Sequence, residues 1–132
     1  MSYLLDTHTL LWNLVATKKL STPVKKIISN PQESIFVSIV SLWEISLKYR
    51  IGKLALKGKN PGEIPGAIKS LGFNILDLDE DTAATFYKFP VSNNKDPFDL
   101  MLVWQAISQD YVLLTKDPDF KSYKKYGLKT IW

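Results

Sequence analysis

Four acidic residues stand close to points where predicted strands and helices begin or end, so that distant parts of the chain could bring their carboxylates together. They are Asp6, Glu44, Asp99 and Asp117. Crowded carboxylates repel one another unless some are protonated or a cation neutralises them. Oxygen ligands alone suit hard divalent ions such as Mg²⁺ or Mn²⁺. One or two such ions bind phosphates and activate water for in-line attack at phosphorus, so these residue types predict a metal-assisted phosphotransfer site.

The elements that would position these acids alternate between short apolar runs and segments of helical periodicity. Strands are predicted at 3–5, 35–37, 73–78, 111–114 and 128–132. Helices are predicted over 7–15, 22–30, 38–51, 79–89 and 96–107, with a shorter one between 64 and 72. This alternation favours an α/β fold with a mostly parallel sheet covered on both faces. The carboxyl ends of parallel strands meet at one edge, so all four acids are expected there.

The first two acids also have purely structural interpretations. Asp6 suits the N-cap position of the helix that follows it. Ser41-Leu42-Trp43-Glu44 matches the capping-box pattern S-x-x-E, which would make Glu44 a helix-start residue. Glu44 also stands four residues before Lys48, which is the spacing of an ordinary surface ion pair.

The other two acids have equally ordinary interpretations. Asp96-Pro97-Phe98-Asp99 reads as an N-cap, a proline at the first helical position and an acid in the first turn. Asp117 precedes a proline and fits a loop. What favours a site is that all four acids occur together, because four separate elements would each place an acid in the same layer of the fold.

Four segments of the chain, in this order, resemble the four motifs of PIN-domain ribonucleases, and in particular of VapC-like toxins of bacterial toxin–antitoxin pairs. The segments are Leu4–His8, Ser41–Lys48 with Gly52-Lys53-Leu54, Lys95–Leu102 with Gln105-Ala106, and Leu113–Phe120. Each motif alone is weak, but four in order at suitable separations are specific. The resemblance covers nearly the whole chain.

The resemblance implies an α/β/α sandwich, dimers, and a site for Mg²⁺ or Mn²⁺. It makes Asp6, Glu44, Asp99 and Asp117 the metal-binding acids, and it leaves Asp96 as either a further ligand or only a helix cap. Relatives often carry a basic residue where this chain has Leu100, which puts one contact to RNA or antitoxin in question.

Four neighbouring residues are secondary candidates for the site. Thr7 and Thr115 could hydrogen-bond ligand carboxylates, or simply cap helices and turns. His8, the only histidine, could touch a scissile phosphate, although a lone histidine beside a cap is more often structural or solvated. Lys48 could contact the acids or the substrate.

Aromatic and basic residues supply candidate contacts to nucleic acid. Two basic runs could guide a phosphate backbone or be solvated faces; they are Lys48, Arg50, Lys53, Lys57 and Lys59, and Lys121, Lys124, Lys125 and Lys129. Tryptophans could stack on bases. For Trp12, Trp43 and Trp104, which lie on amphipathic segments, we expect a place in the core or in a dimer interface.

The length of 132 residues suits one domain, and we expect a single domain over residues 1–132. Cysteine is absent, which excludes disulfides and thiolate chemistry. We see neither a signal peptide nor an apolar run of roughly 20 residues, so we expect a cytoplasmic protein without a membrane segment. The net charge of +4 mildly favours an anionic partner.

Together these observations predict a metal-dependent endoribonuclease that acts as the toxin of a toxin–antitoxin pair. Its expected partners are an RNA substrate, a cognate antitoxin and a second copy of itself, within a homodimer or a higher toxin–antitoxin assembly. The alternative is a catalytically silent PIN fold that only binds RNA or an antitoxin. A haloacid-dehalogenase phosphatase is disfavoured, because that family needs a second aspartate two residues after the first, where this chain has His8.

Overall fold

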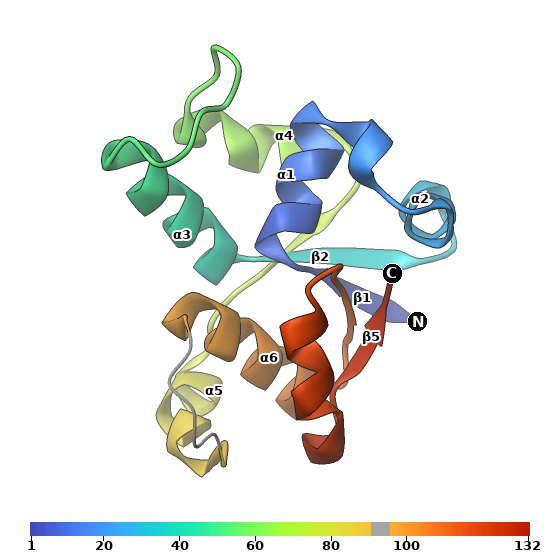
Figure 1. Ribbon diagram of the computed structural model, residues 1–132, viewed down its shortest axis with the longest axis vertical. Helices are drawn as coiled ribbons and strands as arrows, with labels where there is room; N and C mark the ends of the chain where they lie inside the picture. The colour runs from blue at the N-terminus through green and yellow to red at the C-terminus, as the bar shows by residue number, and fades with distance from the viewer. Residues whose placement is uncertain (91–95) are drawn as a thin grey trace.

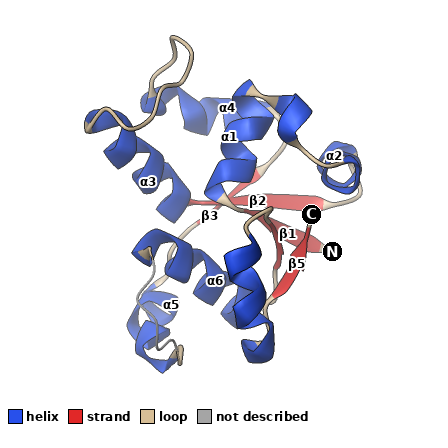
Figure 2. Cartoon of the chain, in the orientation of Figure 1, coloured by secondary structure: helices blue, strands red, loops and turns tan. Residues whose placement is uncertain are grey.

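A computed structural model describes residues 1–90 and 96–132 and shows a five-stranded sheet between layers of helices (Figure 1; Figure 2). The strands are β1 (Ser2–Leu5), β2 (Ser34–Ser38), β3 (Asn74–Leu76), β4 (Val112–Leu114) and β5 (Lys129–Ile131). Their order is β3-β2-β1-β4-β5, and every neighbouring pair is parallel. The predicted parallel sheet is therefore confirmed.

The strand order reverses direction at β1. The chain first builds β2 and β3 on one side of β1 and then returns to build β4 and β5 on the other. Leu5 at the end of β1 pairs in register with Leu114 at the end of β4. In open parallel sheets, ligands bind beyond the carboxyl ends of the strands at such a switch point.

The helices are α1 (Thr7–Val15), α2 (Thr22–Ser29), α3 (Ile39–Arg50), α4 (Ile64–Ser70), α5 (Glu80–Thr85) and α6 (Pro97–Gln109). Short 3₁₀ helices occupy Thr17–Lys19, Pro61–Glu63, Phe86–Lys88 and Pro118–Tyr126. Within the described ranges, no helix is long and apolar enough to cross a membrane.

Two apolar cores lie on opposite faces of the sheet. Because successive side chains of a strand point to opposite faces, Leu5 joins one core and Leu4 the other. The first core contains buried residues of α1, α2 and α4, and the second contains buried residues of α6 and of the 3₁₀ helix 118–126. Helix α3 contributes Ile45 to the first core and Val40 to the second. This arrangement is the predicted α/β/α sandwich.

Local capping corrects several predicted boundaries. The Thr22-Pro23 pair predicts an N-cap at Thr22, but Ser21 is the N-cap of α2, because its hydroxyl accepts the Val24 N–H at 3.2 Å. Strand β3 is shorter than the predicted 73–78 and ends at Leu76. Gly52 has a φ of +77°, which fits its predicted place just after the end of α3. The polar loop predicted at 91–95, which includes Lys95 of the third motif, lies outside the described residues.

Candidate metal centre

Asp6 stands at the switch point, directly after β1 and at the start of α1. The Asp6 N–H donates to the Leu114 carbonyl at 3.1 Å, which continues the β1–β4 ladder by one residue. Asp6 occupies the N-cap position of α1, but its side chain accepts no capping hydrogen bond there. Instead, Asp6 Oδ2 accepts a hydrogen bond of 2.8 Å from the Thr115 hydroxyl. The helix-cap interpretation of the Asp6 side chain is therefore wrong.

The surroundings of Asp6 determine its protonation. Only 4% of the residue is exposed, and this burial raises the pKa of Asp6 above its ordinary value. The hydrogen bond from Thr115 stabilises the carboxylate and opposes that rise. Asp6 is thus a buried acid that carries its charge more easily when a donor or a cation is close.

Glu44 is buried in the interior of α3 rather than placed at its start. Ser38 is the N-cap of this helix, because its hydroxyl accepts the Val40 N–H at 3.0 Å. The predicted capping box of Ser41 and Glu44 is therefore wrong. Ser41 is instead fully buried, and its hydroxyl lies in a 2.8 Å hydrogen bond with Thr7 Oγ1. The pattern S-x-x-E did not show which of two serines begins the helix.

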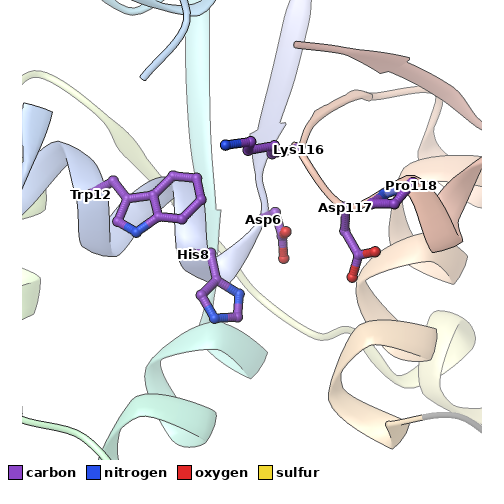
Figure 3. Close-up of a pocket in the computed structure, with 6 residues that line it drawn as sticks. All are labelled: Asp6, His8, Trp12, Lys116, Asp117 and Pro118. Carbon is purple, nitrogen blue, oxygen red and sulfur yellow. The ribbon is translucent and has the colours of Figure 1, made fainter. Parts of the chain in front are cut away.

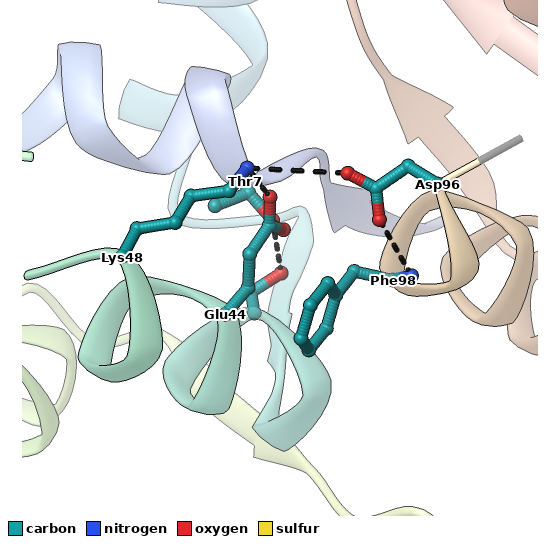
Figure 4. Close-up of polar contacts among 6 residues, drawn as sticks. Thr7, Glu44, Lys48, Asp96 and Phe98 are labelled. Carbon is teal, nitrogen blue, oxygen red and sulfur yellow. Dashed lines mark hydrogen bonds and ion pairs between the residues drawn. The ribbon is translucent and has the colours of Figure 1, made fainter. Parts of the chain in front are cut away.

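The Glu44 carboxylate has a different partner at each oxygen (Figure 4). The Thr7 hydroxyl donates to Oε1 at 2.8 Å, so Thr7 holds the carboxylate that the sequence predicts as a metal ligand. The Lys48 ammonium pairs with Oε2. Since Glu44 is only 2% exposed, the pair with Lys48 is not the ordinary surface ion pair that its spacing allows.

Lys48 lies between acids from two elements. Its Nζ is 3.9 Å from Asp96 Oδ2 as well as in contact with Glu44, so one ammonium links α3 to the start of α6 (Figure 4). Burial alone would lower the pKa of Lys48, but Glu44, Asp96 and Asp99 together raise it above its ordinary value. The lysine therefore supplies a positive charge where the acids gather.

Asp96 is a helix cap and also faces the other acids. Its Oδ1 accepts the Phe98 N–H at 2.8 Å, which confirms the predicted N-cap of α6. Its Oδ2 points toward Lys48. One carboxylate oxygen from each of Glu44, Asp96 and Asp99 lies within 4.8 Å of the others. Capping uses only one oxygen, so it does not prevent Asp96 from binding a cation with the other.

Asp99 lies in the midst of the acids. Burial and the negative charges of four neighbouring acids raise its pKa to about 7. In order of their effect, those neighbours are Asp6, Asp96, Glu44 and Asp117. The other three predicted acids and Asp96 therefore all lie close enough for their charges to act on Asp99.

Asp117 joins the acids from the β4 side. Its Oδ1 accepts the Asp119 N–H at 2.9 Å and caps the 3₁₀ helix 118–126. Its own N–H donates to Thr115 Oγ1 at 3.1 Å, so Thr115 connects Asp117 to Asp6. The carboxylates of Asp6 and Asp117 line one cavity (Figure 3), although neither belongs to the compact group of Glu44, Asp96 and Asp99.

A buried glutamine fixes the spacing of the helices that carry the acids. Gln105 on α6 is fully buried, and its Oε1 accepts the Ser38 hydroxyl at 2.6 Å. Ser38 in turn caps α3, so this bond ties the start of the Glu44 helix to the Asp99 helix. Gln105 lay within the third motif, but its sequence position gave no sign of this role.

His8 is exposed at the start of α1 and separates two cavities. One, of about 330 Å³, is also lined by Asp6 and Asp117. The other, of about 270 Å³, is also lined by Glu44 and Lys48. His8 is therefore accessible to a ligand on either side, as its candidate role requires.

The donor set suits a hard divalent cation. All five acidic side chains offer oxygen, which Mg²⁺ and Mn²⁺ prefer. The pKa of about 7 at Asp99 indicates that the acids repel one another even with the Lys48 ammonium against Glu44. A cation held by Glu44, Asp96 and Asp99 would relieve that repulsion.

Comparison with known proteins agrees with this geometry. A family model of the PIN domain matches residues 3–126, so the chain belongs to the PIN-domain family, as its four motifs predicted. No curated protein matches the chain.

Three of the similar solved structures are bacterial VapBC complexes. The structure of VapBC2 from Rickettsia felis bound to a promoter DNA fragment matches with a TM-score of 0.73 and 18% identity, over 99% of this chain and 98% of that chain. VapBC-1 from nontypeable Haemophilus influenzae matches with a TM-score of 0.69 and 20% identity, over 99% and 97%. DNA-bound VapBC from Salmonella typhimurium matches with a TM-score of 0.67 and 17% identity, over 99% and 97%. At these identities the likeness establishes the shared fold.

Proposed function

We propose that this PIN domain is a metal-dependent endoribonuclease and the toxin of a toxin–antitoxin pair. The observation that carries the proposal is the convergence of five carboxylates from four separate segments, with Asp99 among the other four. A fold needs no such group for stability, since acids that are buried or half-buried and repel one another raise the free energy of the folded state. A divalent cation that binds between these carboxylates relieves their repulsion, which favours its binding.

The acids of the site would all contribute to holding the metal. Glu44, Asp96 and Asp99 would hold the metal, with Asp6 and Asp117 facing it from the ends of β1 and β4. When bound, the metal lowers the pKa of a water molecule and offsets the charge that develops on a phosphodiester during in-line attack.

The neighbouring hydroxyls hold these carboxylates in place. Thr7 orients Glu44 and Thr115 orients Asp6, each through a hydrogen bond of 2.8 Å. Such partners fix the direction of a ligand oxygen before the cation arrives. By resemblance to the family, the products would carry 5′-phosphate and 3′-hydroxyl ends.

The antitoxin proposal rests on an exposed apolar face of α3. Trp43 is 66% exposed, and Leu47 on the same helix and Ile51 directly after it are also exposed. From the sequence, Trp43 and the apolar segment 47–56 are the candidates for part of an antitoxin groove, but Leu56 is buried in the first core, so that part of the prediction is wrong. We propose that an antitoxin segment covers the remaining face and places a guanidinium among the acids, where it would make paired hydrogen bonds in place of the metal.

The assembly and location follow from the same proposal. We propose a homodimer that can enter a larger toxin–antitoxin complex, and a cytoplasmic site of action on cellular RNA. Light scattering of the purified protein, alone and with the product of the adjacent gene, would measure the stoichiometry. A toxin that stays monomeric in both samples would contradict the dimer and leave the nuclease proposal intact.

One observation favours the silent binding module as the alternative. The Lys48 ammonium already neutralises part of the acidic group without any metal. Isothermal titration with Mn²⁺ separates the two functions. The nuclease proposal predicts saturable binding that is lost in Asp99→Asn and kept in Asp77→Asn, which alters an exposed acid. Absence of binding in the wild-type protein would favour the silent module.

Growth tests the toxin role. We expect induction of this chain alone to arrest growth, and co-expression with the adjacent gene product to restore it. The Asp99→Asn variant at equal level should permit growth. Healthy growth with soluble wild-type protein and no partner would count against the toxin assignment.

A further inference from the structure

The cavity beside Asp6 and Asp117 has an aromatic wall that the metal centre does not use. It measures about 330 Å³ and is lined by Asp6, His8, Trp12, Lys116, Asp117 and Pro118. In Figure 3 the indole of Trp12 and the side chain of Lys116 lie on one side, and the two carboxylates lie on the other. The size is at the lower end of the range of roughly 300–1,000 Å³ typical of small-ligand pockets.

Neighbouring rings and helix α1 hold the Trp12 indole in place. Trp132 meets it edge-on, with ring centroids 5.7 Å apart and an interplanar angle of 63°. The His8 ring lies 6.0 Å away at 49°. Trp12 packs against the first core but remains only partly buried. Our expectation that Trp12 belongs to the core is therefore met on one side of the ring, while another part of it faces the cavity.

Two lysines lie against this indole. The Nζ of Lys19 is 5.8 Å from the centroid of a Trp12 ring, and the Nζ of Lys116 is 5.9 Å from it. Neither ammonium forms an ion pair with a carboxylate in the described part of the chain. A cation held only by an aromatic face is easily recruited by a phosphate, because a full negative charge attracts it more strongly than a ring quadrupole does.

We propose that this cavity binds a base of single-stranded RNA next to the scissile phosphate, with the base stacked on Trp12. Lys19 and Lys116 would move from the ring to the phosphates on either side of that nucleotide. The acids favour this orientation, since Asp6 and Asp117 would repel a phosphate in the cavity but not a neutral base. The inference rests on the proposed ribonuclease function and extends it to substrate binding.

Stacking also predicts the kind of selectivity. Every base has a π-face, so an aromatic platform accepts all four bases with modest preference. The Trp12 subsite therefore fixes the position of the nucleotide relative to the acids and leaves the choice of sequence to other contacts.

The test measures binding without cleavage. A short fluorescent single-stranded oligoribonucleotide is titrated with each variant in EDTA, and anisotropy gives the dissociation constant. Trp12→Leu should weaken binding about 5- to 150-fold, the range that stacking one base on an aromatic side chain contributes. Trp12→Phe should recover most of the affinity. This variant also keeps the test valid if Trp12→Leu proves unstable, a point that circular dichroism checks.

The lysine has a matched control. Lys116→Ala should reduce the slope of log affinity against log salt by about 0.7, the value for one phosphate contact to a single strand. Lys69→Ala, which alters an exposed lysine on α4, should leave the slope unchanged. Equal slopes for wild type and Lys116→Ala would remove this residue from the subsite.

Abasic substitutions show whether the base is what Trp12 recognises. At one position of the oligonucleotide, removal of the base should weaken binding to the wild-type protein by the same factor as Trp12→Leu weakens binding to the intact oligonucleotide. Removal of that base should not weaken binding to Trp12→Leu any further. Unchanged affinity in Trp12→Leu, or additive losses in the double change, would overturn the proposal. RNA cleavage in Mn²⁺ is scored separately, so Trp12-dependent binding without cleavage would refute only the nuclease, and cleavage with no Trp12 effect would refute only the subsite.

Discussion

Asp99→Asn should make the metal-free protein more stable, and by an amount that depends on pH. The pKa of Asp99 rises from 3.8 to about 7 in the folded state, because burial and the nearby acids oppose its charge. Between these two values the folded state binds more protons than the unfolded state. The free energy of unfolding therefore falls as pH rises through this window, and the loss is complete above pH 7. An uncharged asparagine removes the loss.

The size of the effect follows from the pKa. A rise from 3.8 to about 7 corresponds to about 4 kcal/mol, at about 1.4 kcal/mol per pKa unit. Asp99 is only partly buried, and solvent screening reduces such interactions strongly. We therefore expect the variant to gain about 1–2 kcal/mol near pH 8 and almost nothing near pH 4.

Urea denaturation in EDTA at several pH values measures this gain as the difference between variant and wild type. Saturating Mg²⁺ should stabilise the wild type and reduce the difference, because a ligand that binds only the folded state adds to its stability. Asp77→Asn, which alters an exposed acid, serves as the control and should follow the wild type at every pH. A variant that is no more stable than the wild type near pH 8, or whose gain is the same at all pH values, would refute the reasoning.

The contacts of three neighbouring side chains make separate predictions. Glu44→Gln keeps the acceptor for Thr7 but removes a charge, so calorimetric Mn²⁺ affinity should fall by about tenfold or more with an unchanged circular dichroism spectrum. Wild-type affinity would remove Glu44 from the site. Lys48→Met leaves the Glu44 carboxylate buried without its cation and should cost about 1–3 kcal/mol in urea denaturation, less than a fully buried pair because the ammonium is partly exposed. Added Mn²⁺ should restore that loss, and a variant as stable as the wild type in EDTA would argue against the pair. Thr115→Val removes the donor to Asp6 and should cost about 1–3 kcal/mol, and it should raise the pKa of Asp6 further. As the pH is lowered, the Mn²⁺ affinity of Thr115→Val should therefore begin to fall at a higher pH than that of the wild type or of Thr115→Ser. Identical pH profiles would contradict this.

Most of the fold could be predicted from the sequence because its signals are local. The apolar runs and the helical spacing between them are sufficient to predict a parallel α/β sheet, and a parallel sheet places Asp6 and Asp117 at one edge. The N-cap of α6 at Asp96 was equally predictable, since the Asp-Pro pair defines a helix start by itself.

The contacts that join elements could not be predicted in this way. The pattern around Ser41 fits a helix start as well as a helix interior, and only the extent of β2 to Ser38 decides between them. The contact of Lys48 with Asp96 depends on how α3 and α6 approach each other, which no spacing along the chain specifies. Asp96 was treated as either a cap or a ligand, but its two oxygens face different partners, so one residue can do both.

We propose that the acids at the carboxyl edge of the sheet hold a metal with which this protein cleaves RNA, and Asp6→Asn neutralises one of those acids. The purified wild type and the variant are incubated with single-stranded RNA in Mn²⁺ and in EDTA, with Asp77→Asn as the matched control. We predict cleavage by the wild type and by the control in Mn²⁺ alone, and none by Asp6→Asn, whose urea midpoint should be at or above that of the wild type because a buried charge has been removed. Cleavage by Asp6→Asn at the wild-type rate, or cleavage by the wild type in EDTA, would show that these acids do not cleave RNA through a bound metal.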